Sequence, residues 1–232
     1  MMIALLVVAM LGMAAAFRPL TLSKSESKSH TLSMVLVNEN YPGQTSPLGF
    51  FDPLGLSRDV SEKRLKLWRE AEIKHGRLAM LAAMGILVQE RFNPLFGGRI
   101  LGAGIYHFQQ VNSVWPAFFL VILASIAFTE MYTILRGWES PADTANAKGT
   151  GGVAMLKDDY IPGDLGFDPL NFLKDKPEGW KRLTPEYINL NNKELNNGRL
   201  AMIGVAGMVA QELLDHKQIF EHISEFGFRS SL

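Results

Sequence analysis

The sequence contains no cysteine among its 232 residues, which excludes disulfide bonds, thiolate nucleophiles, iron–sulfur clusters and cysteine-bound zinc. It has only five histidines, and no two of them have the spacing of a metalloprotease site. The 23 basic and 23 acidic side chains cancel, so no net positive charge indicates a nucleic-acid partner. We therefore predict a protein that is not an enzyme, and membrane or pigment functions remain open.

The first 34 residues have the composition of a targeting leader. Residues 1–13 carry no charge, and the alanines at 14–16 form a small-residue cleavage site. Residues 18–34 are rich in serine and basic side chains and contain a single acid, as organelle transit peptides do. A short buried helix is the alternative for the first stretch. We predict a two-part leader at residues 1–34 and the functional domain at residues 35–232.

A nine-residue motif occurs twice in the remaining chain. Residues Glu72–Met80 read EIKHGRLAM, and residues Glu194–Met202, 122 positions later, read ELNNGRLAM. Upstream, LGFFDPL at 48–54 corresponds to LGFDPL at 165–170. So many matches at nearly one spacing indicate a duplicated unit. Three further pairs share the offset: Gly85 with Gly207, Gln89 with Gln211, and Glu90 with Glu212.

An apolar stretch of 22 residues, Val114–Leu135, lies between the two units, and Glu130 is its only charged side chain. Ser113 is placed to cap a helix here. Trp115 and Trp138 bracket the stretch and would lie about 35 Å apart along a helix. Because that length matches a bilayer with its interfaces, the stretch predicts a transmembrane helix.

The repeated helices have shorter apolar runs, Leu78–Val88 and Leu200–Ala210, of 11 residues each, and runs of this length also occur in soluble proteins. The helical pattern extends further, however: Thr184 and the proline after it start a helix that nothing breaks before about Leu214. Such a helix spans about 45 Å. Basic side chains flank both units on one side, whereas the 91–113 segment holds only two. The sequence thus predicts an all-α membrane protein with three transmembrane helices.

A stripe of apolar residues follows the third helix. Ile219, Phe220, Ile223 and Phe226 share one helical face, with charged residues between them. This pattern predicts a short C-terminal amphipathic helix at the membrane surface. An ordinary packed terminal helix is the alternative.

Charged residues inside the repeated motif indicate how the helices pair. Glu72 and Arg77 are five positions apart, about 140° around a helix, so they cannot pair with each other. Glu194 and Arg199 have the same spacing. If the first and third helices cross as a pseudo-symmetric pair, Arg77 meets Glu194 and Arg199 meets Glu72. We predict these two reciprocal ion pairs; solvated charges on soluble helices are the alternative.

The same motif contains metal-ligand types without a complete ligand set. Glu72 and His75 share a helix face, and Glu194 and Asn197 repeat the arrangement. Each pair alone is too small to hold a free ion. A metal already held by a macrocycle needs only one axial ligand, and hard magnesium accepts oxygen donors. The pattern therefore favours chlorophyll over haem, because only His75 in these helices is a conventional haem ligand.

The two motifs, ExxHGRLAM and ExxNGRLAM, each preceded by LGF(F)DPL, resemble the light-harvesting chlorophyll-binding superfamily. The match is close over 48–91 and 163–214 and loose over the middle helix. The leader resembles the two-part plastid leaders of algae with red-derived secondary plastids. Together these features most resemble the fucoxanthin–chlorophyll a/c-binding proteins and the red-lineage photosystem antenna proteins.

The resemblance implies roles for individual residues. Glu130 stands where the family holds a ligand in its middle helix, but Thr133 replaces the arginine of the plant proteins, and Arg136 is the nearest substitute. The implied axial magnesium ligands are Glu72, His75, Glu194, Asn197 and Gln211, and Arg77 and Arg199 complete the pigment-binding set as ion-pair partners. Four weaker candidates remain: Gln89 by repeat symmetry, His216 or His222 after the third helix, and His107, which we expect to be a satisfied loop histidine.

Two turns also match the family. Asp52-Pro53 and Asp168-Pro169 resemble segments that hold the ends of carotenoids. Plain helix-capping turns are the alternative interpretation of both.

The resemblance implies a light-harvesting antenna of the plastid thylakoid membrane. It would bind chlorophyll a, chlorophyll c and a fucoxanthin-type carotenoid, and pass excitation to a photosystem I or II core beside other antenna subunits and thylakoid lipid. A photoprotective quencher on the same scaffold is the first alternative, and a pigment-free transporter or assembly factor is the second. The 91–113 segment lacks acidic residues, which favours harvesting, whereas Asp215, Glu221 and Glu225 keep the quencher open.

Overall fold

The computed structural model describes residues 41–57, 60–92, 96–140, 155–173, 175, 177–180 and 182–227. The leader predicted at residues 1–34 lies outside these residues. Within them the regular elements are α-helices, joined by loops with two isolated β-bridges. The helices are α3 (Glu62–Arg91), α4 (Gly104–Val114), α5 (Ala117–Gly137), α7 (Pro185–Asp215) and α8 (Ile219–Gly227).

The two long helices, α3 and α7, contain the repeated motif and begin in the same way. The Ser61 hydroxyl accepts a hydrogen bond from the amide of Arg64 at the start of α3. The Thr184 hydroxyl accepts one from the amide of Tyr187 at the start of α7, where Pro185 takes the first helical position. Both devices satisfy amides that have no partner inside the helix. The helix start predicted at Thr184 is confirmed.

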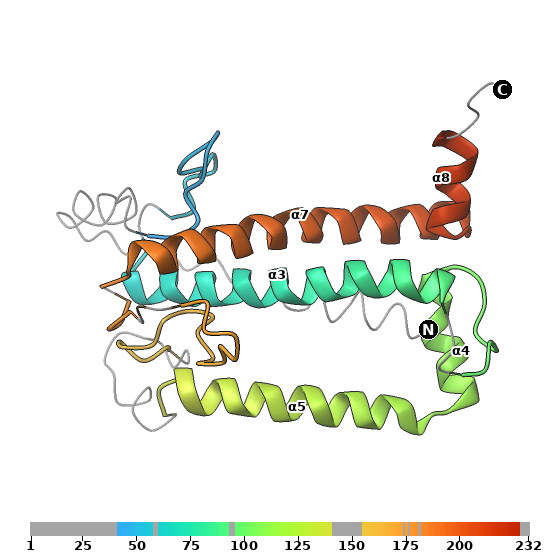
Figure 1. Ribbon diagram of the computed structural model, residues 1–232, viewed down its shortest axis with the longest axis horizontal. Helices are drawn as coiled ribbons and strands as arrows, with labels where there is room; N and C mark the ends of the chain where they lie inside the picture. Colours follow the sequence, from blue (N-terminus) through green and yellow to red (C-terminus); the bar gives the residue numbers. More distant parts are fainter. Residues whose placement is uncertain are drawn as a thin grey trace, which may run out of the picture.

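α3 and α7 lie side by side and run in the same direction, while α5 runs the opposite way beside them (Figure 1). The contact between the repeated helices is built from matching positions of the two units. Ile73 and Leu195 are 2% and 3% exposed, and Gly76 and Gly198 are buried beside them. The predicted pairing of the two repeated helices is therefore present.

The segment before α5 differs from the prediction. Residues 104–114 form the separate helix α4 instead of a loop, and Ser113 lies inside it rather than capping α5. α4 ends at Val114 because the following residue, Trp115, precedes Pro116 and is forced into an extended conformation. α5 starts after that proline, at Ala117. Because proline lacks an amide hydrogen and its ring crowds the preceding residue, Pro116 separates α4 from α5.

α5 has the length and apolar composition of a membrane span, and it is the one helix among the described residues that meets this measure. Its side chains are almost all exposed: Leu120 is 68%, Leu123 62% and Phe128 72% accessible. So large an apolar surface is not left to water in a soluble protein. The structure supports a membrane protein, and α5 is long and apolar enough to cross a bilayer, while the three crossings stay a prediction.

The short helix predicted after the third long helix is present as α8, at the same end of the α3–α7 pair as α4 (Figure 1). Its first residue, Ile219, is 7% exposed, and the Phe220 ring lies under the Arg91 guanidinium, 5.0 Å from its carbon. Ile223, one turn on, is 51% exposed. One end of α8 is therefore packed against the long helices and the other presents apolar surface.

Candidate functional site

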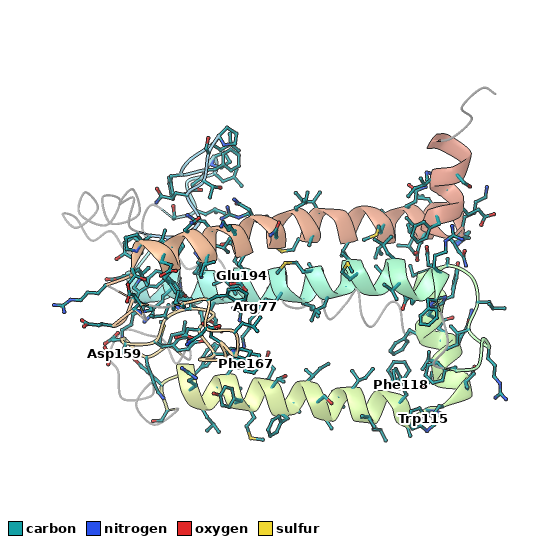
Figure 2. The ribbon with its side chains drawn as sticks, in the orientation of Figure 1. Arg77, Trp115, Phe118, Asp159, Phe167 and Glu194 are labelled. Atoms are coloured by element: carbon teal, nitrogen blue, oxygen red, sulfur yellow. The ribbon has the colours of Figure 1, made fainter. Side chains whose placement is uncertain are left out.

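Two ion pairs connect α3 and α7 in a crossed arrangement. Arg77 Nε donates to Glu194 Oε1 at 2.6 Å, and Arg199 Nε donates to Glu72 Oε1 at 2.8 Å. Figure 2 shows Arg77 and Glu194 close together at the α3–α7 contact. Each helix thus provides one acid and one base to the other, and the reciprocal pairing predicted from the spacing is confirmed.

Glycine permits the close approach on which these pairs depend. A Cβ atom placed on Gly198 would lie 2.9 Å from the Cα of Gly76, and one on Gly76 would lie 3.1 Å from the Cα of Gly198. Backbone atoms cannot move aside as a flexible side chain can. The two helices therefore touch through their backbones at the residue beside each arginine.

Each arginine also holds a turn that lies before a long helix. Arg77 Nη2 donates to the carbonyl oxygen of Gly163 at 2.8 Å. Arg199 Nη1 donates to the carbonyl oxygen of Gly43 at 3.1 Å. Both glycines have a positive φ, 79° and 103°, which other residues rarely adopt. The turn that precedes one helix is thus bound by the arginine of the other.

The amides of the same two glycines are bound by residues at matching repeat positions. The Gly163 amide donates to Glu70 Oε2 on α3 at 2.7 Å. The Gly43 amide donates to Asn192 Oδ1 on α7 at 2.6 Å. Each turn is therefore held at both the amide and the carbonyl group of its glycine. In Figure 1 the blue segment after residue 40 lies against α7, and the orange segment before α7 lies beneath α3.

These turns were missed by the sequence analysis, which began the repeat at the LGF(F)DPL segments. The signal is present further upstream, where Tyr41-Pro42-Gly43 corresponds to Ile161-Pro162-Gly163 at an offset of 120. Pro42 and Pro162 are both fully buried. A recurring Pro-Gly before each unit was enough to predict a pair of turns, although not their partners.

The two ion pairs differ in one respect. Glu72 Oε2 accepts a further bond from Arg69 at 2.5 Å, so two guanidinium groups hold this carboxylate. Asn191 occupies the position of Arg69 in the second unit. Within the described residues, Glu194 makes its ion pair through Oε1. Each carboxylate oxygen has two lone pairs, so both glutamates keep acceptor capacity, and Glu194 keeps more of it.

His75 meets the requirement for an axial ligand. Its side chain is exposed, and its Nδ1 lies 2.7 Å from the carbonyl oxygen of Ala71. A carbonyl only accepts, so Nδ1 carries the proton and Nε2 presents its lone pair outward. Asn197, at the matching position of α7, is exposed as well. The donor types and their orientation therefore fit a magnesium already held by a macrocycle.

Gln211 and His222 belong to one cluster. Gln211 Nε2 lies 2.7 Å from the His222 ring and donates to Asp215 Oδ2 at 2.5 Å. His216 is turned away, with its Nδ1 2.5 Å from the hydroxyl of Tyr106. Of the two histidines that competed for a site after the third helix, His222 is the one placed beside Gln211.

Gln89 and His107 have other surroundings. Gln89 lies against the start of α4, where a Cβ on Gly104 would meet its Nε2 at 2.8 Å, so it does not share the environment of its repeat partner Gln211. His107 is 6% exposed, and its Nε2 lies 2.9 Å from the carbonyl oxygen of Gly102. The His107 ring has a hydrogen-bond partner as expected, but it lies in helix α4 and not in a loop.

Glu130 is paired with a cation that the sequence analysis did not foresee. Its Oε2 lies 2.7 Å from Lys74 Nζ on α3 and accepts from the Thr133 hydroxyl at 3.3 Å. Arg136, the expected substitute, instead donates to the carbonyl oxygen of Leu165. The expectation for Arg136 was wrong because its position near the end of α5 brings it within reach of the loop that precedes α7.

The two Asp-Pro turns have the same geometry. Asp52 accepts hydrogen bonds from the amides four and five residues later at 3.0 and 2.9 Å, and Asp168 does so at 3.1 and 3.0 Å. The Ser57 hydroxyl also donates to Asp52, and these bonds lower the pKa of the Asp52 carboxyl. Both aspartates organise their own turns, so any contact with a carotenoid would come from the apolar residues around them.

A cavity of about 840 Å³ lies between the 41–57 segment and the starts of α3 and α7. Its wall includes Phe50, Trp68 and Trp180 together with the ion-paired Glu72 and Arg199. This volume lies in the range of sites that hold cofactor-sized molecules. The wall combines aromatic side chains with several charged ones, Arg69 and Glu62 among them, and is suited to a large ligand with both apolar and polar parts.

Two further carboxylates lie at the opposite end of the long helices. Glu212 Oε2 accepts from the amide of Ile105 in α4 at 2.7 Å, and Glu90 accepts from the amide of Ile219 in α8 at 3.0 and 3.1 Å. Each long helix thus binds the start of the short helix that follows the other.

Comparison with known proteins agrees with this geometry. Residues 37–213 match the family described as chlorophyll A-B binding protein. The chain is 46% identical over 192 residues to light-harvesting complex stress-related protein 3.2 of Chlamydomonas reinhardtii, covering 80% of this chain and 68% of that protein. It is 39% identical over 172 residues to a fucoxanthin-chlorophyll a-c binding protein of Isochrysis galbana, covering 74% and 75%. It is 31% identical over 212 residues to protein F of that type from Phaeodactylum tricornutum, covering 88% and 92%.

The family match spans both repeated units and α5, and therefore includes the crossed ion pairs and the residues around them. All three relatives are described as chloroplastic. By its motifs, its helical architecture and these likenesses, the chain belongs to the chlorophyll a-b binding protein family.

Proposed function

We propose that the protein is a light-harvesting antenna that binds chlorophylls and carotenoid and passes excitation energy to a photosystem. One observation carries this proposal: the crossed Arg–Glu pairs bring α3 and α7 together while the imidazole of His75 presents a free nitrogen outward. A soluble helix pair has no need of such a ligand on its exposed face. The donor set of single Glu, His, Asn and Gln side chains suits chlorophyll magnesium.

The chain contributes position and orientation rather than bond chemistry. The bound pigments supply the absorption of light and the transfer of excitation. The protein fixes each pigment because its ligands project from two helices that glycine contacts and ion pairs hold at a constant separation. Arg77 and Arg199 neutralise the carboxylates of Glu194 and Glu72, so that these groups are tolerable in an apolar environment. The axial ligands in this proposal are Glu72, His75, Glu194, Asn197, Gln211 and Glu130.

We further propose that α3, α5 and α7 all cross the membrane. α3 and α7 contain 30 and 31 residues, which span about 45 Å. A helix of that length crosses a bilayer at a tilt and protrudes on one side. The antiparallel direction of α5 then places the basic segments before α3 and after α5 on one face of the membrane, as the positive-inside rule requires.

The location that follows is the plastid thylakoid membrane, where the partners would be a photosystem core, other antenna subunits and lipid. Chlorophyll a, chlorophyll c and a fucoxanthin-type carotenoid are the proposed pigments, supported by the fucoxanthin-chlorophyll relatives. Residues 1–34 would be removed on import. N-terminal sequencing of the plastid protein is expected to begin near residues 34–38, and a start at Met1 would refute the leader.

Pigment analysis of the isolated complex tests the main proposal. The purified protein should absorb as chlorophyll and carotenoid do, with several chlorophylls per chain by chromatographic count. Excitation of the carotenoid should yield chlorophyll fluorescence, which shows that the pigments are close and oriented for transfer. A colourless native protein would contradict the proposal and favour the pigment-free alternatives.

A photoprotective quencher is the second candidate, because the stress-related relatives share 46% of the aligned residues. On that proposal the bound chlorophylls would lose excitation as heat under acidic conditions. Fluorescence lifetime of the isolated complex against pH separates the two roles. A lifetime that shortens several-fold between pH 7.5 and pH 5.5 would favour quenching, and a constant lifetime would favour harvesting.

A further inference from the structure

Glu130 lies on the exposed helix α5 and is fixed through one of its two oxygens. Lys74 Nζ on α3 lies 2.7 Å from Oε2, and the Thr133 hydroxyl donates to the same oxygen at 3.3 Å. Among the described residues both contacts are made to Oε2, and neither is made to Oε1. The Glu130 side chain is 49% exposed. One oxygen is therefore held by Lys74, while the side chain as a whole is half exposed.

Lys74 is itself held from the opposite side. Its Nζ lies 3.9 Å from Oε1 of Glu70, a carboxylate that is 4% exposed. Glu70 is fixed by the amide of Gly163 at 2.7 Å and by the Tyr160 hydroxyl at 3.3 and 3.4 Å. Lys74 thus stands between a rigid buried acid and Glu130, so its position, and with it the direction of the Glu130 carboxylate, is determined by the turn before α7.

The charge of Lys74 answers a need that α5 cannot meet by itself. Residues 117–135 of α5 contain one side chain that is charged at neutral pH, Glu130. A single carboxylate in apolar surroundings is costly unless a cation compensates it. Arg136 is engaged with Leu165, so the compensating cation comes from α3. The carboxylate reaches its paired state only when α5 is docked beside α3.

We propose that Lys74 is the positioning residue of a chlorophyll site on α5 in which Glu130 Oε1 is the axial magnesium ligand. Lys74 holds Oε2, which aims Oε1 outward and neutralises the carboxylate. Hard magnesium accepts a single carboxylate oxygen as an axial ligand. This inference rests on the proposed pigment-binding function and assigns one of its sites.

A second lysine of α3 provides the matched control. Lys63 Nζ lies 3.0 Å from Oε1 of Glu139, just after α5, and 3.3 Å from Oδ1 of Asp158. Like Lys74, it connects α3 with the α5 region through acidic side chains. No ligand candidate is among its partners. If a lysine–acid link between α3 and the α5 region were all that mattered, the two lysines would be equivalent.

The test is reconstitution of the full chain with a chlorophyll and carotenoid extract, followed by pigment counting and absorption difference spectra. Lys74→Met and Glu130→Leu are each expected to lose one chlorophyll per chain, and the same absorption band should disappear in both. The double variant should lose no further pigment. Lys74→Arg should retain the band because it keeps the charge. Lys63→Met should bind the full pigment set.

Retention of all chlorophylls by Lys74→Met would overturn the proposal, as would loss of the same band in Lys63→Met. If Lys74→Met does not assemble, Lys74→Gln takes its place, because it keeps a polar side chain of similar length and removes the charge. Loss of the band in Lys74→Gln supports the proposal, and its retention overturns it.

The wild-type protein separates this inference from the proposed function. A wild type without pigment contradicts the antenna function itself. A wild type with its full pigment set and a Glu130→Leu variant that loses none contradicts only the site on α5.

Discussion

His75 illustrates how one local contact sets the chemistry of a residue. Because its Nδ1 is committed to the Ala71 carbonyl, the other ring nitrogen is available to a metal. We expect His75→Ala to lose one chlorophyll per chain while the fold persists, since the side chain is exposed. His75→Asn copies the matching residue of α7, Asn197, and should retain the pigment. Chromatographic pigment counts check both, and an unchanged count in His75→Ala would show that His75 is not a ligand.

Arg77 has a structural role that its exposed counterparts lack. Arg77→Leu leaves the carboxylate of Glu194 and the carbonyl of Gly163 without their donor. Loss of one member of a desolvated pair costs about 3 kcal/mol, so the reconstituted complex should melt at a clearly lower temperature. Arg182 pairs with Glu178 on the surface, with both side chains more than 70% exposed.

Arg182→Leu is the control for that measurement, and thermal unfolding of the two variants should differ. An exposed pair contributes about 0–1 kcal/mol, so Arg182→Leu should melt close to the wild type. Equal melting temperatures for the two variants would mean that the crossed pair of Arg77 does not stabilise the helix contact.

At the residue scale, contacts that follow from helical spacing could be predicted from the sequence, whereas contacts between segments far apart in the chain could not. A five-residue spacing excludes pairing within a helix, so Arg77 and Glu194 could be matched through the repeat alone. The partner of Glu130 could not be predicted in this way. Lys74 lies on another helix, and the sequence does not reveal how that helix is rotated relative to α5. The partners of the Gly43 and Gly163 turns could not be predicted for the same reason, since they lie on the opposite unit.

At the scale of elements, the contact between α3 and α7 depends on two glycines. Gly198→Ala should destabilise the complex by about 1–3 kcal/mol, because its Cβ would lie 2.9 Å from the Gly76 backbone. Gly207, on the same helix, has open space around its Cα. Gly207→Ala should be neutral or slightly stabilising, because alanine favours the helix. Thermal unfolding compares the two, and equal destabilisation would refute the close contact.

The elements themselves were predictable where caps and periodicity coincide. α7 follows from Thr184 and the proline after it, and α8 follows from its apolar stripe. α4 was not recognised, because the glycines at 97, 98 and 102 and the polar HFQQ sequence resemble a loop. Its N-terminal amide is bound by Glu212, far along the chain, and local sequence contains no trace of that contact.

At the scale of the whole molecule, the duplication explains both what was predictable and what was not. The repeat required two related helices that meet, which α3 and α7 do. α5 has no counterpart in the repeat, and it is attached through α4, through the pair of Glu130 with Lys74 of α3, and through the loop before α7. This helix was predicted at Val114–Leu135 and is observed at Ala117–Gly137, and its cation partner was not foreseen.

The turn before each long helix is bound by the other long helix, so each half of the chain holds a part of the other. In a molecule with a single unit, the carbonyl of the Pro-Gly turn would have no arginine to bind it, and the arginine would have no turn to bind. Two identical copies would satisfy each other, so the present contact is also the contact of a symmetric dimer. Once joined, the halves could change separately: Glu70 serves one turn and Asn192 the other. Joining the two units in one chain thus allows the two turns to be bound by different residues, as Glu70 and Asn192 are.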